Sequence, residues 1–370
     1  MSERGGLPAL LAALLVLTPS LPVAAEPVAT LLDLPFAASA LRGPGSEVAV
    51  AVATSGLLPL ARPKGGASED GAPIAVVWGE AGGAALALVD GRVTVTLLGR
   101  EAVEGLAAAE TPRGALAGSR RAIAGALSAH LAEPVTVGGR TGAGALVIRE
   151  RKAVPMSAEP KPVPVATATV RPAPDAAFAL RSPQIAAFDG RPAILAVTET
   201  EGGSSLAVIE PAEAGWSVRA RGPLEAGKPL QVAGIADFSG TGRPQIAVTG
   251  PTDGVTRLRL WAYEGGALRV LHAASGYDAA ALGYDAAAPG EGGPGLSALL
   301  PRDGAVDLAL PVADRSALAI VSLKGAVTER ARVPLPAPAA FGVATLGTGP
   351  AARLLVGLAD GRIAVVNPKP

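Results

Sequence analysis

The residues that could support metal chemistry are few and scattered. The only histidines are His130 and His272, and neither has a second ligand at the His-x-x-x-His or Glu-x-x-His spacing that zinc enzymes use. The chain has no cysteine, so thiolate ligands and disulfides are excluded. This composition argues against a zinc or transition-metal site, and we expect both histidines to be partly exposed polar residues.

Motifs for covalent and phosphate chemistry are also missing. The sequence has no Gly-x-Ser-x-Gly nucleophile elbow. Its nearest approach to a phosphate-binding loop, Gly222 to Lys228, has Pro229 where the metal-binding hydroxyl belongs. The carboxylates are scattered, and no pair of them indicates glycosidase chemistry. We therefore predict no catalytic and no cofactor-binding residues.

A duplicated motif, Gly-Tyr-Asp-Ala-Ala, places Tyr277 and Tyr284 in a long connection. Connections carry function more often than the strands do, and exposed tyrosines frequently anchor interfaces. The two tyrosines are therefore candidate partner-binding residues. The alternative is that one or both rings cover the edge of the core, which is favoured because buried tyrosine is common.

Short strands must position these residues, because a polar loop followed by an apolar strand recurs along the chain. The clearest copy runs from Asp237 to Val248. Four such units can be superposed between about residue 182 and the end, and in each a turn and a second strand follow. A repeat of about 50 residues with three or four short strands is typical of a propeller blade. The sequence thus predicts an all-β propeller of about seven four-stranded blades, which would need about 350 residues.

The first half of the chain follows this pattern less closely. Residues 47–52 and 72–78 read as strands, and residues 85–98 read as a hairpin. A helical insertion is predicted near 119–132, with Ser119 as its N-cap. Its apolar face would hold three residues that are four positions apart: Ile123, Leu127 and Leu131.

From Asp237 the chain resembles the FG-GAP or VCBS repeat family, the blades of integrin-α-like and bacterial exported β-propellers. The family's loop reads Asp-x-Asp-Gly-Asp-Gly-x-x-Asp and runs into a strand. Gly240 and Gly242 match its glycines, and the resemblance covers residues 182–370. The loop's four ligand positions hold Asp237, Ser239, Thr241 and Gln245.

The resemblance implies a calcium loop at these four residues. Calcium takes six to eight oxygen ligands, and its affinity rises with the number of carboxylates. This copy has one carboxylate where the pattern has four. The alternatives are a weak, vestigial calcium site and a metal-free turn in which Asp237 and Ser239 accept backbone N–H groups. The single carboxylate favours the metal-free turn, and we expect no cofactor.

The first 25 residues have the order of a secretory signal peptide. An apolar run from Leu7 to Leu17 is followed by the small residues Val23-Ala24-Ala25. The run is too short to favour a membrane span. We expect residues 26–370 to form a single propeller domain, periplasmic or secreted, with no membrane span after signal removal.

The charge balance restricts the partners. The chain has 32 basic and 32 acidic residues, which argues against nucleic acid and against electrostatic membrane docking. The favoured function is a non-catalytic binding or scaffold module in the cell envelope, holding a protein or a glycan. The alternatives are a polysaccharide-active propeller enzyme, a lyase or hydrolase with acids at the central channel, and an envelope assembly factor.

Overall fold

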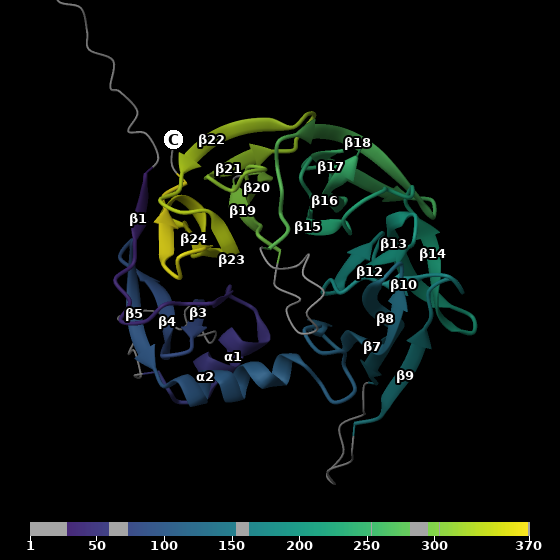
Figure 1. Cartoon of the computed structure of the whole chain (residues 1–370), viewed down its shortest axis with the longest axis horizontal. Helices are drawn as coiled ribbons and strands as arrows, with labels where there is room; N and C mark the ends of the chain where they lie inside the picture. Colours follow the sequence, from purple (N-terminus) through teal and green to yellow (C-terminus); the bar gives the residue numbers. More distant parts are fainter. Residues whose placement is uncertain are drawn as a thin grey trace, which may run out of the picture.

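The chain folds into a ring of antiparallel β-sheets around a central axis (Figure 1). The described residues of this computed structural model form four four-stranded sheets and one nine-stranded sheet. The predicted all-β propeller fold is confirmed. The predicted signal peptide lies outside the described residues. The structure describes residues 28–58, 73–152, 163–252, 254–281, 295–302 and 304–368.

The first half of the chain supplies one four-stranded sheet and the nine-stranded sheet. The four-stranded sheet consists of β2 (Ala40–Arg42), β3 (Ile74–Gly79), β4 (Gly82–Val89) and β5 (Arg92–Leu98). The nine-stranded sheet consists of β6 (Ala122–Ala124), β7 (Leu127–Val137), β8 (Arg140–Arg151), β9 (Val165–Val170), β10 (Ala177–Phe178), β11 (Gln184–Phe188), β12 (Arg191–Thr200), β13 (Gly203–Ala212) and β14 (Gly215–Arg221).

The second half supplies the other three sheets. One consists of β15 (Gln231–Ala236), β16 (Gln245–Thr252), β17 (Val255–Glu264) and β18 (Ala267–Ser275). The next consists of β19 (Ala298–Arg302), β20 (Ala305–Pro311), β21 (Ala317–Ser322) and β22 (Thr328–Pro334). The last consists of β23 (Ala339–Leu346), β24 (Arg353–Leu358), β25 (Ile363–Val366) and β1 (Ala29–Leu31), with a short 3₁₀ turn, η2 (Gly349–Ala351), between β23 and β24.

The ring is closed by strands from the two ends of the described chain. β1 pairs with β25 in antiparallel register, with Thr30 opposite Val365. Figure 1 shows the purple β1 on the outside of the yellow sheet. This pairing adds the outermost strand of the last sheet from the opposite end of the chain, which ties the two ends of the ring together.

The nine-stranded sheet contains two four-stranded meanders, β6–β9 and β11–β14. They are joined by β10, in which Phe178 pairs with Ala143 of β8 and with Thr198 of β12. The strands predicted from the repeats are confirmed as β11 to β13, β15 to β17, β20, β21 and β23 to β25. These sheets do not confirm the predicted count of about seven blades.

Two helices fill the sector of the ring between the β2–β5 sheet and the nine-stranded sheet (Figure 1). α1 (Glu47–Thr54) and α2 (Arg100–Ala107), with the 3₁₀ turn η1 (Ala108–Glu110), form this helical sector. Val48, Val52 and Val103 are fully buried against the β2–β5 sheet. The prediction of a strand at 47–52 was therefore wrong, because Val48 and Val52 also share one face of a helix and Ser46 caps its N-terminus by accepting from the Ala49 N–H.

The helix predicted near 119–132 was also wrong, because β6 and β7 cover this segment. A spacing of four is an even number, so Leu127 and Leu131 also share one face of a strand. Both pack into the core between the two meanders of the nine-stranded sheet. Gly125, with φ at +56°, provides the left-handed turn between the two strands.

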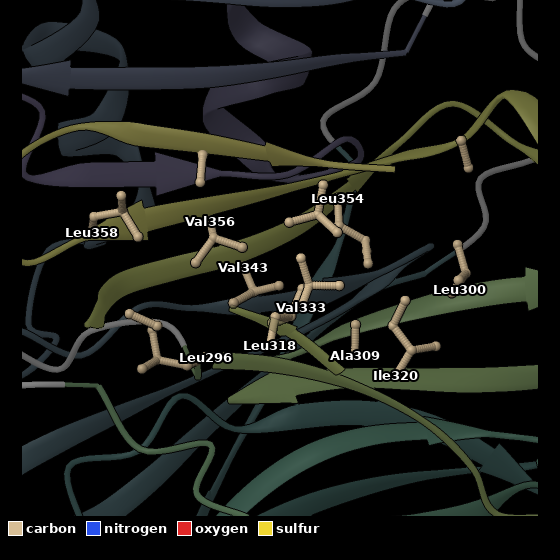
Figure 2. Packing of buried hydrophobic residues seen from close by; sticks show 14 of the residues in the cluster. Leu296, Leu300, Ala309, Leu318, Ile320, Val333, Val343, Leu354, Val356 and Leu358 are labelled. Atoms are coloured by element: carbon tan, nitrogen blue, oxygen red, sulfur yellow. The ribbon is translucent and has the colours of Figure 1, made fainter. Parts of the chain in front are cut away.

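Neighbouring sheets stack face to face and bury apolar side chains between them. Figure 2 shows one such layer, where Leu318 and Ile320 face Val343 and Val356 across the gap between two sheets. Inner strands are covered on both faces, so all of Ala317–Ser322 is buried, whereas the outermost β22 alternates between exposed residues and partly or fully buried ones. This difference explains why the inner strands read as continuous apolar runs.

Candidate functional site

The predicted calcium loop lies between β15 and β16, where Asp237 closes it by accepting two backbone bonds. Its Oδ1 accepts from the Thr241 N–H at 2.9 Å, and its Oδ2 accepts from the Gly242 N–H at 2.6 Å. Burial raises the pKa of Asp237, but the bonds from Gly242, Thr241 and Gly240 outweigh it and hold this pKa below its usual value. The carboxylate is therefore stabilised in its charged form by the loop itself.

Gln245 closes the same loop from the other side. Its Oε1 accepts from the Phe238 and Ser239 N–H groups at 2.8 and 3.2 Å. Its Nε2 donates to Ser239 Oγ at 2.6 Å and to the Arg243 carbonyl at 2.8 Å. The Ser239 hydroxyl also lies 3.2 Å from that of Thr241. The structure thus brings all four predicted ligand residues together, and their polar atoms bond mainly to the loop.

Local sequence explains this conformation. Phe238 is fully buried and anchors the start of the loop in the core. Gly242 has a φ of +81°, a left-handed conformation that few side-chain-bearing residues adopt. Across the described parts of the chain, no group of three or more His, Asp or Glu side chains has the arrangement of a metal site.

A shallow pocket lies beside this loop. Phe188 and Tyr263 form its aromatic part, with ring centroids 5.3 Å apart in an edge-to-face arrangement. Arg243 and Glu264 lie 3.5 Å apart at its charged side. The cavity volume of the pocket is only about 20 Å³. Its lining residues are Phe188, Asp189, Arg243, Pro244, Gln245, Ala262, Tyr263 and Glu264.

The size and polarity of this pocket limit what it can hold. Small-molecule and cofactor sites usually enclose about 300–1,000 Å³, so this pocket is far too small to be one. Burial, with a hydrogen bond to Glu210, raises the pKa of Tyr263 to about 12, so its hydroxyl stays protonated. The pocket is therefore a shallow surface depression, and the groups that it presents to a partner are chiefly the exposed Arg243 and Glu264, of opposite charge.

Tyr277 is not presented at the surface. Its side chain is buried, and its hydroxyl donates to Glu329 Oε2 at 3.1 Å. Arg332 donates twice to the same carboxylate, at 2.8 Å each, and holds the pKa of Glu329 below its usual range. Tyr277 therefore occupies the seam between two sheets, and Tyr284 lies outside the described residues.

The two histidines lie far apart in the ring. His272 is half-buried in β18. His130 is buried in β7, contrary to the expectation of partial exposure, because β7 is an inner strand and not a surface helix. Burial and the charges of Arg149 and Arg121 lower the pKa of His130, which keeps its imidazole neutral at neutral pH.

Glu199, near the end of β12, is a buried acid that the sequence reasoning missed. Its side chain is only 3% exposed, and its Oε2 has no hydrogen-bond partner among the described residues. The nearest cation, Arg140, has its Nε at 3.9 Å from that oxygen. Burial raises the pKa of Glu199, although Arg140 and Arg181 partly oppose the shift. The one sequence signal was its position two residues after Val197, on a strand face that otherwise carries apolar residues.

Comparisons with known proteins add little to this geometry. No protein-family model matches the sequence, and no curated protein matches it. Among solved structures, the chain is similar to the C-terminal WD40 domain of Sif2, with 11% identity and a TM-score of 0.37. That alignment covers 80% of this chain and 92% of the WD40 domain. Neither α-helix in the described part of the chain is long and apolar enough to cross a membrane.

Proposed function

We propose that this chain is a non-catalytic binding or scaffold module of the cell envelope, built as a propeller of the FG-GAP or VCBS type. The observation that carries this proposal is the loop at Asp237, which is locked by its own hydrogen bonds and forms one wall of the shallow pocket. A surface that is rigid before binding loses less conformational entropy when it takes a partner.

The chemistry of the pocket supports a protein or a glycan as the partner. Arg243 and Glu264 at its rim offer exposed groups of both charge signs to such a partner, whereas Phe188 and Tyr263 are buried beneath them. Arg243 is 64% exposed, so its pairing with Glu264 is readily exchanged for a bond to a ligand. Loops at the end of a propeller also vary in sequence without disturbing the sheets, which suits a recognition surface.

Site-specific photo-crosslinking tests this role. A photo-reactive residue at Arg243, beside the pocket, should capture a discrete partner from an extract of the organism's cell envelope. The matched control is Leu97 on the outer strand β5, which is 58% exposed and belongs to a sheet that contributes no residue to the pocket. Equal capture at both positions, or no capture at Arg243, would contradict the proposed binding face.

Export is a separate part of the proposal and has its own test. The apolar run and small residues before Glu26 support removal of residues 1–25 and a single domain from 26 to 370 in the periplasm or medium. We expect the protein in that fraction to begin at Glu26, as read by mass spectrometry. Full-length protein retained in the cytoplasm would contradict export while leaving the binding face untouched.

A further inference from the structure

Charged side chains lie in the seam between the helical sector and the nine-stranded sheet, whereas apolar clusters fill the seams between sheets. Arg42, at the end of β2, donates from Nε to Glu110 Oε2 at 2.9 Å. Arg121, directly before β6, donates from Nε to Glu47 Oε2 of α1 at 2.9 Å. Each of these two pairs is electrically neutral.

Arg120 is a third guanidinium in the same seam, and it has no such partner. It makes no hydrogen bond or ion pair with any residue that the structure describes, and its Nε is buried. Burial, followed by the charge of Arg42, lowers the pKa of Arg120 to about 10, and Glu110 opposes this shift. Arg120 is still charged at neutral pH, so the three arginines exceed the two glutamates by one positive charge.

Ser119 adds a second unpartnered group next to Arg120. Its side chain is 1% exposed, and its Oγ has no hydrogen-bond partner within the described chain. The Ser119 N–H donates to the Leu116 carbonyl at 2.9 Å, which fixes the serine in a turn. Buried donors without acceptors are costly, so the Ser119 hydroxyl and the Arg120 Nε–H both need an acceptor that the described chain does not supply.

The surroundings of the seam are also electropositive. His130 on β7 is neutral and buried, and its pKa is lowered by burial and then by Arg149 and Arg121. Burial is the larger cause of this shift, and Arg149 adds a further positive charge on the β7 side of the seam. A guanidinium presents a planar fork of N–H donors that matches the oxygens of a carboxylate or phosphate.

We propose that this seam binds a small oxyanion, a phosphate or carboxylate group, held by Arg120 and Ser119. β2 and β6, which bring Arg42 and Arg121 to the seam, are each the last strand in the order of their sheets, at the edge opposite the outer strands β5 and β14. The site is therefore at the inner side of the ring. It lies on different elements from the pocket at Arg243 and does not depend on the proposed envelope role.

Thermal melting of the mature chain in inorganic phosphate or in acetate tests the proposal, with chloride adjusted to hold ionic strength constant. We expect the melting temperature to rise saturably with the anion that binds, since a ligand specific for the folded state stabilises it. A rise with phosphate alone identifies a phosphate group, and a rise with acetate identifies a carboxylate. No saturable rise in either would overturn the proposal.

Variants separate Arg120 from other anion contacts. Arg120→Met should weaken the anion response at least about tenfold, the effect of losing a charge-assisted bond. In chloride alone it should melt no lower than the wild type, because a buried Nε–H without an acceptor has been removed. Arg113→Met, on an exposed arginine of the same connection, is the matched control and should keep the wild-type response.

Arg120→Lys keeps the positive charge but lacks the planar set of guanidinium N–H donors. It tests the same site if Arg120→Met does not fold. It should fold and show a weaker anion response than the wild type. An anion response of wild-type strength in Arg120→Met or in Arg120→Lys would place the anion elsewhere and overturn the site.

Discussion

Asp307 shows how this ring accommodates a charge in its interior. The carboxylate is completely buried, and its two oxygens accept from Arg330 Nε at 3.0 Å and Arg302 Nε at 3.2 Å. Arg330 is 51% exposed and Arg302 is 34% exposed, so both arginines reach in from solvent. The acid is therefore neutralised by side chains that keep part of their hydration.

Removing the Asp307 charge should destabilise the fold. We expect Asp307→Asn to lower the free energy of unfolding by about 1–3 kcal/mol, below the range for a pair buried on both sides, because the two arginines can return to water. Urea unfolding measures this change. Asp360→Asn, which removes the exposed partner of Arg362, is the control and should leave the unfolding midpoint unchanged.

Glu199 should make stability depend on pH in the opposite direction from an ordinary paired acid. Its pKa in the folded chain is raised by burial, so the folded state binds its proton more tightly than the unfolded state does. The contribution of Glu199 to the free energy of unfolding is therefore fully present below its pKa in the unfolded chain, about 4.3. This contribution is lost as the pH rises through its pKa in the folded chain. Glu199→Gln should match the wild type at pH 4 and be more stable at pH 7 in urea unfolding.

A Glu199→Gln variant that loses stability at neutral pH would show that the charged carboxylate is paired in solution. The exposed Glu201 is a suitable control position, because Glu201→Gln changes charge at the following turn without changing a buried group. Its pH profile should follow that of the wild type.

At the scale of elements, the loop between β15 and β16 makes a prediction about calcium. Both oxygens of the Asp237 carboxylate and the Gln245 Oε1 already accept backbone N–H groups, and only one ligand position carries a charge. We expect added Ca²⁺ or a chelator to leave the melting temperature unchanged. An ion-dependent rise that disappears in Asp237→Ala would show that the loop opens to bind calcium.

The strands were predictable wherever a repeat supplied both a turn and an apolar run. Residue spacing alone was ambiguous elsewhere, because positions four apart share a face in a helix and in a strand alike. Leu127 and Leu131 therefore suggested a helix although they lie in β7, and Val48 and Val52 suggested a strand although they lie in α1. Tertiary packing decided both cases, since β7 packs between the two meanders of the nine-stranded sheet and α1 packs against the β2–β5 sheet.

The candidate sites were predictable to different degrees for a related reason. The four residues of the Asp237 loop lie within nine positions and form a motif, so the sequence identified them together. The groups around Arg120 come from separate elements, and Arg42 and Glu110 are 68 positions apart. Pairing between distant residues determines which charged groups are left without a partner. A local sequence pattern therefore cannot identify those groups.

At the scale of the whole molecule, the pairing of β1 with β25 should control stability. Thr30 and its neighbours complete the last sheet, and the Leu32 N–H donates to the Ile363 carbonyl at 2.9 Å. A chain that begins after residue 32 should lose about 2–4 kcal/mol of unfolding free energy relative to one that begins at residue 28, from lost backbone bonds and the packing of Leu32. Urea unfolding compares the two chains, and equal midpoints would mean that the closure is dispensable.

The two strands of this closure also constrain the order of folding events. The Thr30 hydroxyl donates to the Val365 carbonyl across 335 positions of sequence. Contacts of such high sequence separation slow folding, because the entropy of closing the intervening chain is lost before the contact forms. During synthesis β1 leaves the ribosome first and must wait, unpaired, until the final strand emerges. Shielding the short segment near residue 30 during that interval would prevent this one strand from pairing with a wrong edge.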